Sequence, residues 1–266
     1  MMSDEIFTKQ KSVLKKDRTR MNTTLFLTEF KLYLRSFYGP FFALVFPLLM
    51  LVLFGSIYGN EPTPFYGGRG SMDVMMPGNI ALILCVSAFM GLPLTLGENK
   101  DNRVYKRFDA TPAGKERVIL IQILVQVAVT VIGVFLQLGV GWMLYRVQIS
   151  HLWLLFIGVC AAMYSLFSMG YLIAAASPNL KITNAICYTL YFGMMFISGC
   201  SLPREILPDS INRIAKLFPL THTVDLLNGI TQNQSLSQYW LSWAVLLGGG
   251  TICFLISLYL SKKNAW

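Results

Sequence analysis

The sequence predicts an all-α membrane protein with six transmembrane helices, because of its composition, its long apolar runs and the distribution of its basic residues. Of the 266 residues, 55% are apolar and only 13% are charged, whereas a soluble domain carries about 25% charged residues. This leaves too little polar surface to cover a water-facing globule. The five cysteines form no CxxC motif and no Cys/His cluster, so neither a metal site nor a disulfide framework is indicated.

Six stretches have the roughly 20 mostly apolar residues that a membrane-spanning helix needs. None of them contains Asp, Glu, Lys, Arg or His. They are residues 38–58, 76–97, 118–145, 152–176, 182–201 and 239–261. Pro40 and Pro47 in the first stretch, and Gly91 with Pro93 in the second, predict kinks or local unwinding.

The basic residues predict the orientation of these spans. With the N-terminus inside, the inner segments hold 17 of the 22 Lys and Arg residues, and such an excess is typical of the cytoplasmic side. Both termini are therefore expected in the cytoplasm. Residues 1–21 have no apolar core of the kind a cleavable signal requires, and are expected to form a disordered basic extension. The basic residues flank apolar runs, which argues against a nucleic-acid-binding patch.

The segment before the first span predicts an amphipathic helix lying in the membrane interface. Its aromatic residues recur at helical spacing, while a threonine and two basic residues take the opposite face. The aromatic residues are Phe26, Phe30, Tyr33 and Phe37, and the opposite face holds Thr28, Lys31 and Arg35. The alternative is a frayed start to the first span.

The segment between the fifth and sixth spans predicts short helices that dip into the outer leaflet. Asp209 or Ser210 is placed to cap a helix that Pro219 ends, and a second apolar stretch follows over residues 224–227. The first helix would present one apolar face, made of Ile211, Ile214, Ala215 and Phe218. It is too short to cross a bilayer, at about 1.5 Å per residue. An ordinary external loop with surface helices is the alternative.

The charged loop 98–117 predicts two helices separated by a break. Residues 98–108 suit a short helix that carries three basic residues on one side, and Val104 and Phe108 on another. The basic residues are Arg103, Lys106 and Arg107. Thr111 followed by Pro112 is typical of an N-cap and a first helical position, so a second helix is expected to start at Pro112 and lead into the third span. A plain solvated loop is the alternative.

The sequence contains no catalytic motif: no GxxxxGK[ST], GxGxxG, HExxH or GxSxG pattern occurs in a fitting context. The two histidines, His151 and His222, lie in predicted outer segments and are read as structural. Ion-coupled carriers commonly keep an ionisable side chain at membrane depth, and these spans have none. Energy for transport is therefore expected from a cytoplasmic partner, although sodium coupling through backbone carbonyls stays open.

The order of these elements resembles the permease subunits of type-2 ATP-binding-cassette (ABC) exporters, over residues 22–266. Three stretches carry the resemblance: FKLYLRSF, GENKDNRVYKRFDATPAGKERVILIQI and SLPREILPDSINRIAKLFPLTHTVDLL. The resemblance implies an elbow helix, a cytoplasmic coupling helix and re-entrant outer helices. It assigns ATPase coupling to Glu98, Arg103, Tyr105, Lys106, Arg107, Phe108, Thr111 and Pro112, the elbow to Phe26, Phe30, Lys31, Tyr33 and Arg35, and the re-entrant helices to Pro208, Ile211, Ile214, Phe218 and Pro219.

The resemblance implies a non-enzymatic subunit of the bacterial plasma membrane that exports an amphipathic drug, a lipid-linked molecule or a peptide. Its expected partners are two ABC ATPase subunits, a second permease copy or paralogue, and membrane lipid, with no nucleic acid. No cofactor is expected on this chain, and ATP and Mg²⁺ are expected on the partner. An ion-coupled secondary carrier, or a non-transporting immunity or scaffold protein, is the alternative.

Overall fold

The fold is a bundle of long helices, seen in a computed structural model that describes residues 21–64, 68–109, 111, 114–149, 151–200, 208–232, 234 and 236–263. The expected extension lies outside these residues except for Met21. Within the described part, six helices are long and apolar enough to cross a membrane. They are η1 and α3 (Phe41–Val45, Phe46–Tyr58), α4, η3 and α5 (Ser71–Val86, Ser87–Gly91, Leu92–Asp101), α7 (Lys115–Tyr145), α8 (Leu152–Ala176), α9 (Leu180–Ile197), and α12, η6 and α13 (Trp240–Ala244, Val245–Gly249, Gly250–Lys263).

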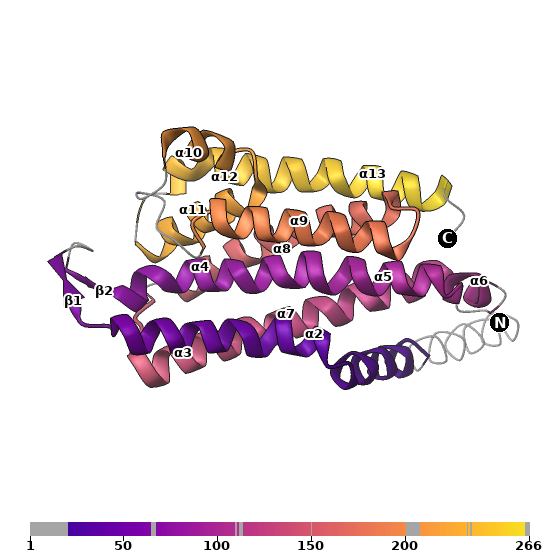
Figure 1. The fold of residues 1–266 in the computed structure, drawn as a ribbon, viewed down its shortest axis with the longest axis horizontal. Coiled ribbons are helices and arrows are strands. Elements are labelled where there is room, and N and C mark those ends of the chain that lie inside the picture. Colours follow the sequence, from indigo (N-terminus) through magenta and orange to yellow (C-terminus); the bar gives the residue numbers. More distant parts are fainter. Residues whose placement is uncertain are drawn as a thin grey trace, which may run out of the picture.

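Short elements cap the two ends of this bundle (Figure 1). One end holds α6 (Val104–Asp109), the helix over residues 21–35 and the last turn of α13. The opposite end holds the two-stranded sheet, β1 (Pro62–Thr63) with β2 (Arg69–Gly70), and α10 (Asp209–Ala215). The remaining short elements are α2 (Tyr38–Pro40), α11 (Pro219–Thr231) and η5 (Leu236–Tyr239).

The second span is the centre of the bundle. Over its most apolar stretch 83% of the residues are buried, against 22% in the first, fifth and sixth spans. Its helices α4 and α5 pack against α3, α7, α8, α9 and α11. The helix runs from Ser71 to Asp101, beyond the predicted 76–97 at both ends, because helical backbone continues past the apolar run into charged residues. The fourth span, 152–176, was predicted with its observed bounds.

Wide helical turns occur where prolines predicted kinks. The π-helical segments Phe41–Val45 and Ser87–Gly91 lie just before Pro47 and Pro93. A proline has no N–H for the carbonyl four residues earlier, and its ring crowds that carbonyl. The carbonyls concerned, of Ala43 and Phe89, both lie inside the π segments. The predicted unwinding is therefore confirmed at both places, as wide turns within otherwise continuous helices.

Asn60 holds the start of the second span. Its Oδ1 accepts hydrogen bonds from the backbone N–H groups of Met72 (3.0 Å) and Asp73 (3.2 Å). Its Nδ2 donates to the carbonyl of Tyr145 at 2.9 Å and to Asp73 at 3.2 Å. Asp73 in turn accepts from the Gln148 N–H at 3.1 Å. Since the residue before α4 supplies no side-chain cap, Asn60 caps this helix from ten residues upstream and ties it to the end of α7.

The two helices between the fifth and sixth spans exist, with other bounds than predicted. The first, α10, begins at Asp209 after Pro208, so Pro208 stands at the N-cap position and the predicted cap residues Asp209 and Ser210 are the first two residues of the helix. Pro219 is the first residue of the second helix, α11, which has 13 residues. A proline needs no N–H at that position; the first helix ends at Ala215, four residues before Pro219, so Pro219 starts the second helix and is not the direct end of the first.

The second of these helices is largely buried. It packs on α8 and α4, and only four of its residues are partly exposed: Pro219, Asp225, Asn228 and Thr231. His222, 4% exposed, accepts or donates at both ring nitrogens: Nε2 lies 2.9 Å from the Lys216 carbonyl and Nδ1 lies 3.3 Å from Ser242 Oγ. With Nε2 donating and Nδ1 accepting, both groups are satisfied, which fits the structural role predicted for this histidine. In α10, Ala215 is buried while Ile214 is 51% exposed.

Candidate functional site: the end of the bundle around helix α6

The connection between the second and third spans begins with a sharp turn. Helix α5 ends at Asp101, and Arg103 has φ of 56°, the left-handed conformation that non-glycine residues rarely adopt. Helix α6 then has only six residues. The predicted single helix over 98–108 is therefore split, and Glu98 belongs to the last turns of the second span. The Arg107 guanidinium donates to the Asn102 carbonyl at 3.3 Å and bridges the turn.

Tyr105 fixes α6 to the third span. Its side chain is fully buried, and its hydroxyl donates to Gln122 Oε1 in α7 at 2.7 Å. Burial raises the pKa of Tyr105, so the hydroxyl stays protonated. The resemblance assigned Tyr105 to ATPase coupling; in this structure its ring has no exposed surface that a partner could contact.

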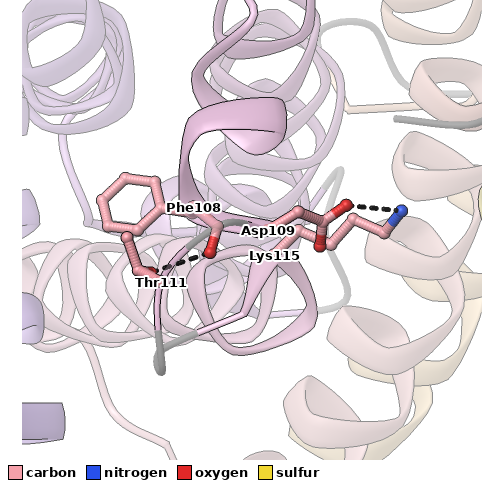
Figure 2. A network of polar contacts seen from close by, with 4 residues as sticks. All are labelled: Phe108, Asp109, Thr111 and Lys115. Atoms are coloured by element: carbon pink, nitrogen blue, oxygen red, sulfur yellow. Dashed lines mark hydrogen bonds and ion pairs between the residues drawn. The ribbon is translucent and has the colours of Figure 1, made fainter.

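Figure 2 shows how α6 ends and α7 begins. Thr111 Oγ1 donates to the Phe108 carbonyl at 2.8 Å, and the Asp109 carboxylate pairs with Lys115 Nζ at 3.2 Å. The sequence predicted that Thr111 caps the helix of the third span, and this prediction is wrong. Thr111 closes α6 instead. Helix α7 starts at Lys115 after Gly114, whose φ of 69° and ψ of 150° suit glycine almost alone. The predicted start, Pro112, lies outside the described residues.

Three of the exposed side chains in the turn and on α6 are basic, and the exposed Asp109 of α6 is paired with Lys115. Arg103, Lys106 and Arg107 are exposed at this end of the molecule, and Phe108 is partly exposed beside them. A six-residue helix spans about 9 Å at 1.5 Å per residue. The surface is thus a compact patch of basic side chains with one aromatic ring. It is attached to the second and third spans.

A second connection joins this region. Lys100 Nζ donates to the Ser177 carbonyl at 2.7 Å, and Asp101 Oδ2 accepts from the Leu180 N–H at 2.9 Å. Asn179 caps α9 through a 3.0 Å bond to the Ile182 N–H. The end of the second span is thereby held to the connection between the fourth and fifth spans. Sequence reasoning missed Lys100 and Asp101, because charged residues next to a span carry no motif that reveals their partners.

In the helix over residues 21–35, three of the four predicted aromatic residues, Phe26, Phe30 and Tyr33, are partly buried, whereas Phe37 lies beyond the helix and is 72% exposed. Phe26 and Phe30 stack with ring centroids 6.0 Å apart, and Lys31 and Arg35 are exposed. Tyr33 accepts a 3.4 Å hydrogen bond from the Gln126 amide in α7, so this helix contacts the third span. The helix also exposes three leucines, the most exposed of them at 59%. Its position in the membrane interface remains a prediction.

Within the described residues, no group of three or more His, Cys, Asp or Glu side chains is placed to hold a metal ion. No curated protein matches the chain closely enough to report. A family model does match: the ABC-2 type transporter, over residues 22–231. The match includes the helix over residues 21–35 from its second residue, the first five spans and the whole region around α6. The chain therefore belongs to the ABC-2 type transporter family, and is a membrane-spanning permease component of an ABC transporter.

Proposed function

We propose that this chain is the permease subunit of an ATP-driven exporter, and that α6 receives mechanical work from an ATPase subunit in the cytoplasm. The observation that supports the proposal is the attachment of α6 to two spans. It shares a turn with the second span, a buried hydrogen bond from Tyr105 to the third, and an ion pair from Asp109 to the same helix. A force on α6 therefore acts on two spans together.

The link through the end of α5 extends this action. Lys100 and Asp101 hold the connection between the fourth and fifth spans. Motion of α5 would accordingly displace α8 and α9 as well. An element that transmits force to several spans must be attached to each of them, and these contacts provide such attachments.

The chemistry of the exposed face fits a protein partner. Arg103, Lys106 and Arg107 suit carboxylates on an ATPase subunit, where complementary charge sets specificity and association rate. Phe108 adds an apolar contact that a partner can cover. ATP and Mg²⁺ would bind on that partner and not on this chain. Thr111, which closes the end of α6, and Glu98, in the last turns of α5, are exposed close to these basic residues in the sequence.

The membrane position follows from charge and aromatic residues. Trp142, Trp153 and Trp240 are 72%, 64% and 68% exposed near helix ends opposite α6, as at a membrane–water interface. The excess of basic residues at the α6 end supports an orientation with both termini in the cytoplasm, and we propose that the membrane is a bacterial plasma membrane. Exposed apolar side chains of α3, α9 and α13 would meet lipid or a second permease copy, identical or paralogous.

The short helices fit the same frame. The 13 residues of α11 cover about 20 Å, which is less than the roughly 30 Å of a bilayer core. With α10, this helix would enter the outer leaflet and return. The helix over residues 21–35 would lie along the inner leaflet, with Lys31 and Arg35 toward the lipid headgroups.

Co-purification with an ATPase subunit tests the proposal. The triple variant R103Q/K106Q/R107Q is expected to lose binding and stimulation of the ATPase by on the order of tenfold or more, because three charge pairs disappear. The matched control K31Q/R35Q/K263Q removes three exposed charges elsewhere near this end and should keep both. Equal behaviour of the two variants would contradict the lever role of α6. Transport that needs a sodium or proton gradient and no ATP would favour the ion-coupled carrier.

A further inference from the structure

Two adjoining cavities lie between the helix over residues 21–35 and the bundle, near the α6 end. Their volumes are about 420 Å³ and 290 Å³. They share four lining residues: Tyr33, Ser36, Thr95 and Glu98. The smaller cavity is bounded by α5 and α7, and the larger one reaches η1, η3 and α9. Together they form one polar and one apolar compartment at the level proposed for the inner leaflet.

The polar compartment contains two carboxylates. Glu29 and Glu98 both line the smaller cavity, and no Lys, Arg or His lines either cavity. Burial raises the pKa of Glu29, as expected where a carboxylate loses water without gaining a cation. A positively charged ligand would supply the missing countercharge.

The walls also hold two buried amide side chains. Gln122, which lines the smaller cavity and is 4% exposed, accepts a hydrogen bond from Tyr105 at Oε1, and its side chain interacts with the Glu29 carboxyl. In the larger cavity, Asn184 Oδ1 is buried and has no partner among the described residues. A buried acceptor without a partner is costly, so the Asn184 oxygen favours a ligand that brings positive charge or an N–H donor.

The larger cavity continues into an apolar wall. Its residues come from the first, second and fifth spans: Phe42, Ala43, Val86, Met90, Leu94 and Leu180. Glu98 lines this compartment as well and so lies where the two meet. A molecule that fills both compartments needs a charged or polar end and an apolar body.

We propose that these cavities bind an amphipathic organic cation, with its positive centre near Glu29 and Glu98 and its apolar body against the wall around Phe42 and Met90. The proposal rests on the proposed export function and names the substrate class that the permease would accept. The binding site is formed by one protomer, and it requires neither ATP nor the ATPase subunit.

Binding of tetraphenylphosphonium to the purified permease tests this site. The protein is placed in nanodiscs of zwitterionic phosphatidylcholine, so that the lipid has no net charge to concentrate the cation or repel an anion, and binding is measured without an ATPase. Saturable binding is expected, with an affinity on the order of tenfold lower in E29Q/E98Q, because two charge interactions are lost. Tetraphenylborate has the same shape and the opposite charge, and it should show no saturable binding.

Two further variants complete the test. E61Q/E116Q removes two exposed carboxylates that line neither cavity and should bind the cation as wild type does. M90W fills the apolar compartment and should weaken binding with both carboxylates intact, which keeps the test open if E29Q/E98Q fails to fold. Absence of saturable cation binding, equal binding of the borate anion, or unchanged affinity in both E29Q/E98Q and M90W would overturn the proposal. None of these results bears on ATPase coupling through α6.

Discussion

Tyr105 and Gln122 join α6 to the third span through a buried hydrogen bond of 2.7 Å. Removing the hydroxyl in Y105F leaves the Gln122 oxygen without this donor while the ring keeps its packing. We expect a loss of about 1 kcal/mol in the free energy of unfolding, the usual net value of a buried hydrogen bond. ATPase stimulation should fall as well, because α6 is then held less firmly. Thermal unfolding and ATPase assays of the reconstituted complex measure the two effects.

A double-mutant cycle separates the hydrogen bond from other effects of the substitution. Y105F should cost clearly less in a Q122L background, since the partner is already absent. Y58F is the matched control, because Tyr58 is 53% exposed; it should be near neutral. An equal cost of Y105F in both backgrounds would show that the Gln122 contact is not the cause.

Arg103 combines a charge with an unusual backbone conformation, and two substitutions separate them. R103A and R103G remove the same charge, but only glycine adopts a φ of 56° without steric cost. R103G should therefore be more stable than R103A by about 1 kcal/mol. ATPase binding should weaken equally in both, if the charge is what the partner recognises. Chemical denaturation and affinity measurements check this, and a large difference in affinity would instead assign the role to the turn.

The spans could be predicted from the sequence because bilayer thickness imposes a long apolar run on each. Residues 152–176 were predicted with their observed bounds, and the prolines at 47 and 93 marked the π-helical turns. Such signals are local, since they depend on a residue and its neighbours within one helical turn. The family assignment rested on the order of these local signals, and the family match confirmed it.

The charged connection was predicted less well, because its structure depends on contacts distant in sequence. Thr111–Pro112 is a common helix start, yet Thr111 bonds backward to Phe108 and α7 starts after Gly114. Gly114 can adopt a positive φ, which is unfavourable for other residues. This property favoured a helix start after Gly114 over a start at Pro112. Nothing local shows that Tyr105 is buried against Gln122, or that Lys100 reaches Ser177. Helix packing decides both.

Asn60 offers a test of the outer end of the bundle. N60A removes the acceptor for two N–H groups at the start of α4 and the donor to the Tyr145 carbonyl. We expect a loss of about 1–2 kcal/mol in the free energy of unfolding, the upper range for a helix cap. S56A is the control, because this exposed hydroxyl bonds only within its own helix; it should change stability little. A near-neutral N60A would mean that water replaces these bonds.

Glu29 predicts how stability changes with pH. Its folded-state pKa is raised above the model-compound value of 4.5 by burial, so the fold favours the protonated form. The stability that this preference contributes is complete below pH 4.5 and is lost as the pH rises through the raised value. E29Q, which cannot ionise, should therefore gain stability relative to wild type as the pH rises through that window. Melting temperatures of both proteins from pH 4 to pH 8 measure the difference, with E116Q, at an exposed carboxylate, as the control. Saturating tetraphenylphosphonium should stabilise the wild type more as the pH rises, because the cation favours the ionised carboxyl. It should therefore reduce the stability advantage of E29Q. A difference in melting temperature that does not change with pH would show that Glu29 does not titrate in this range.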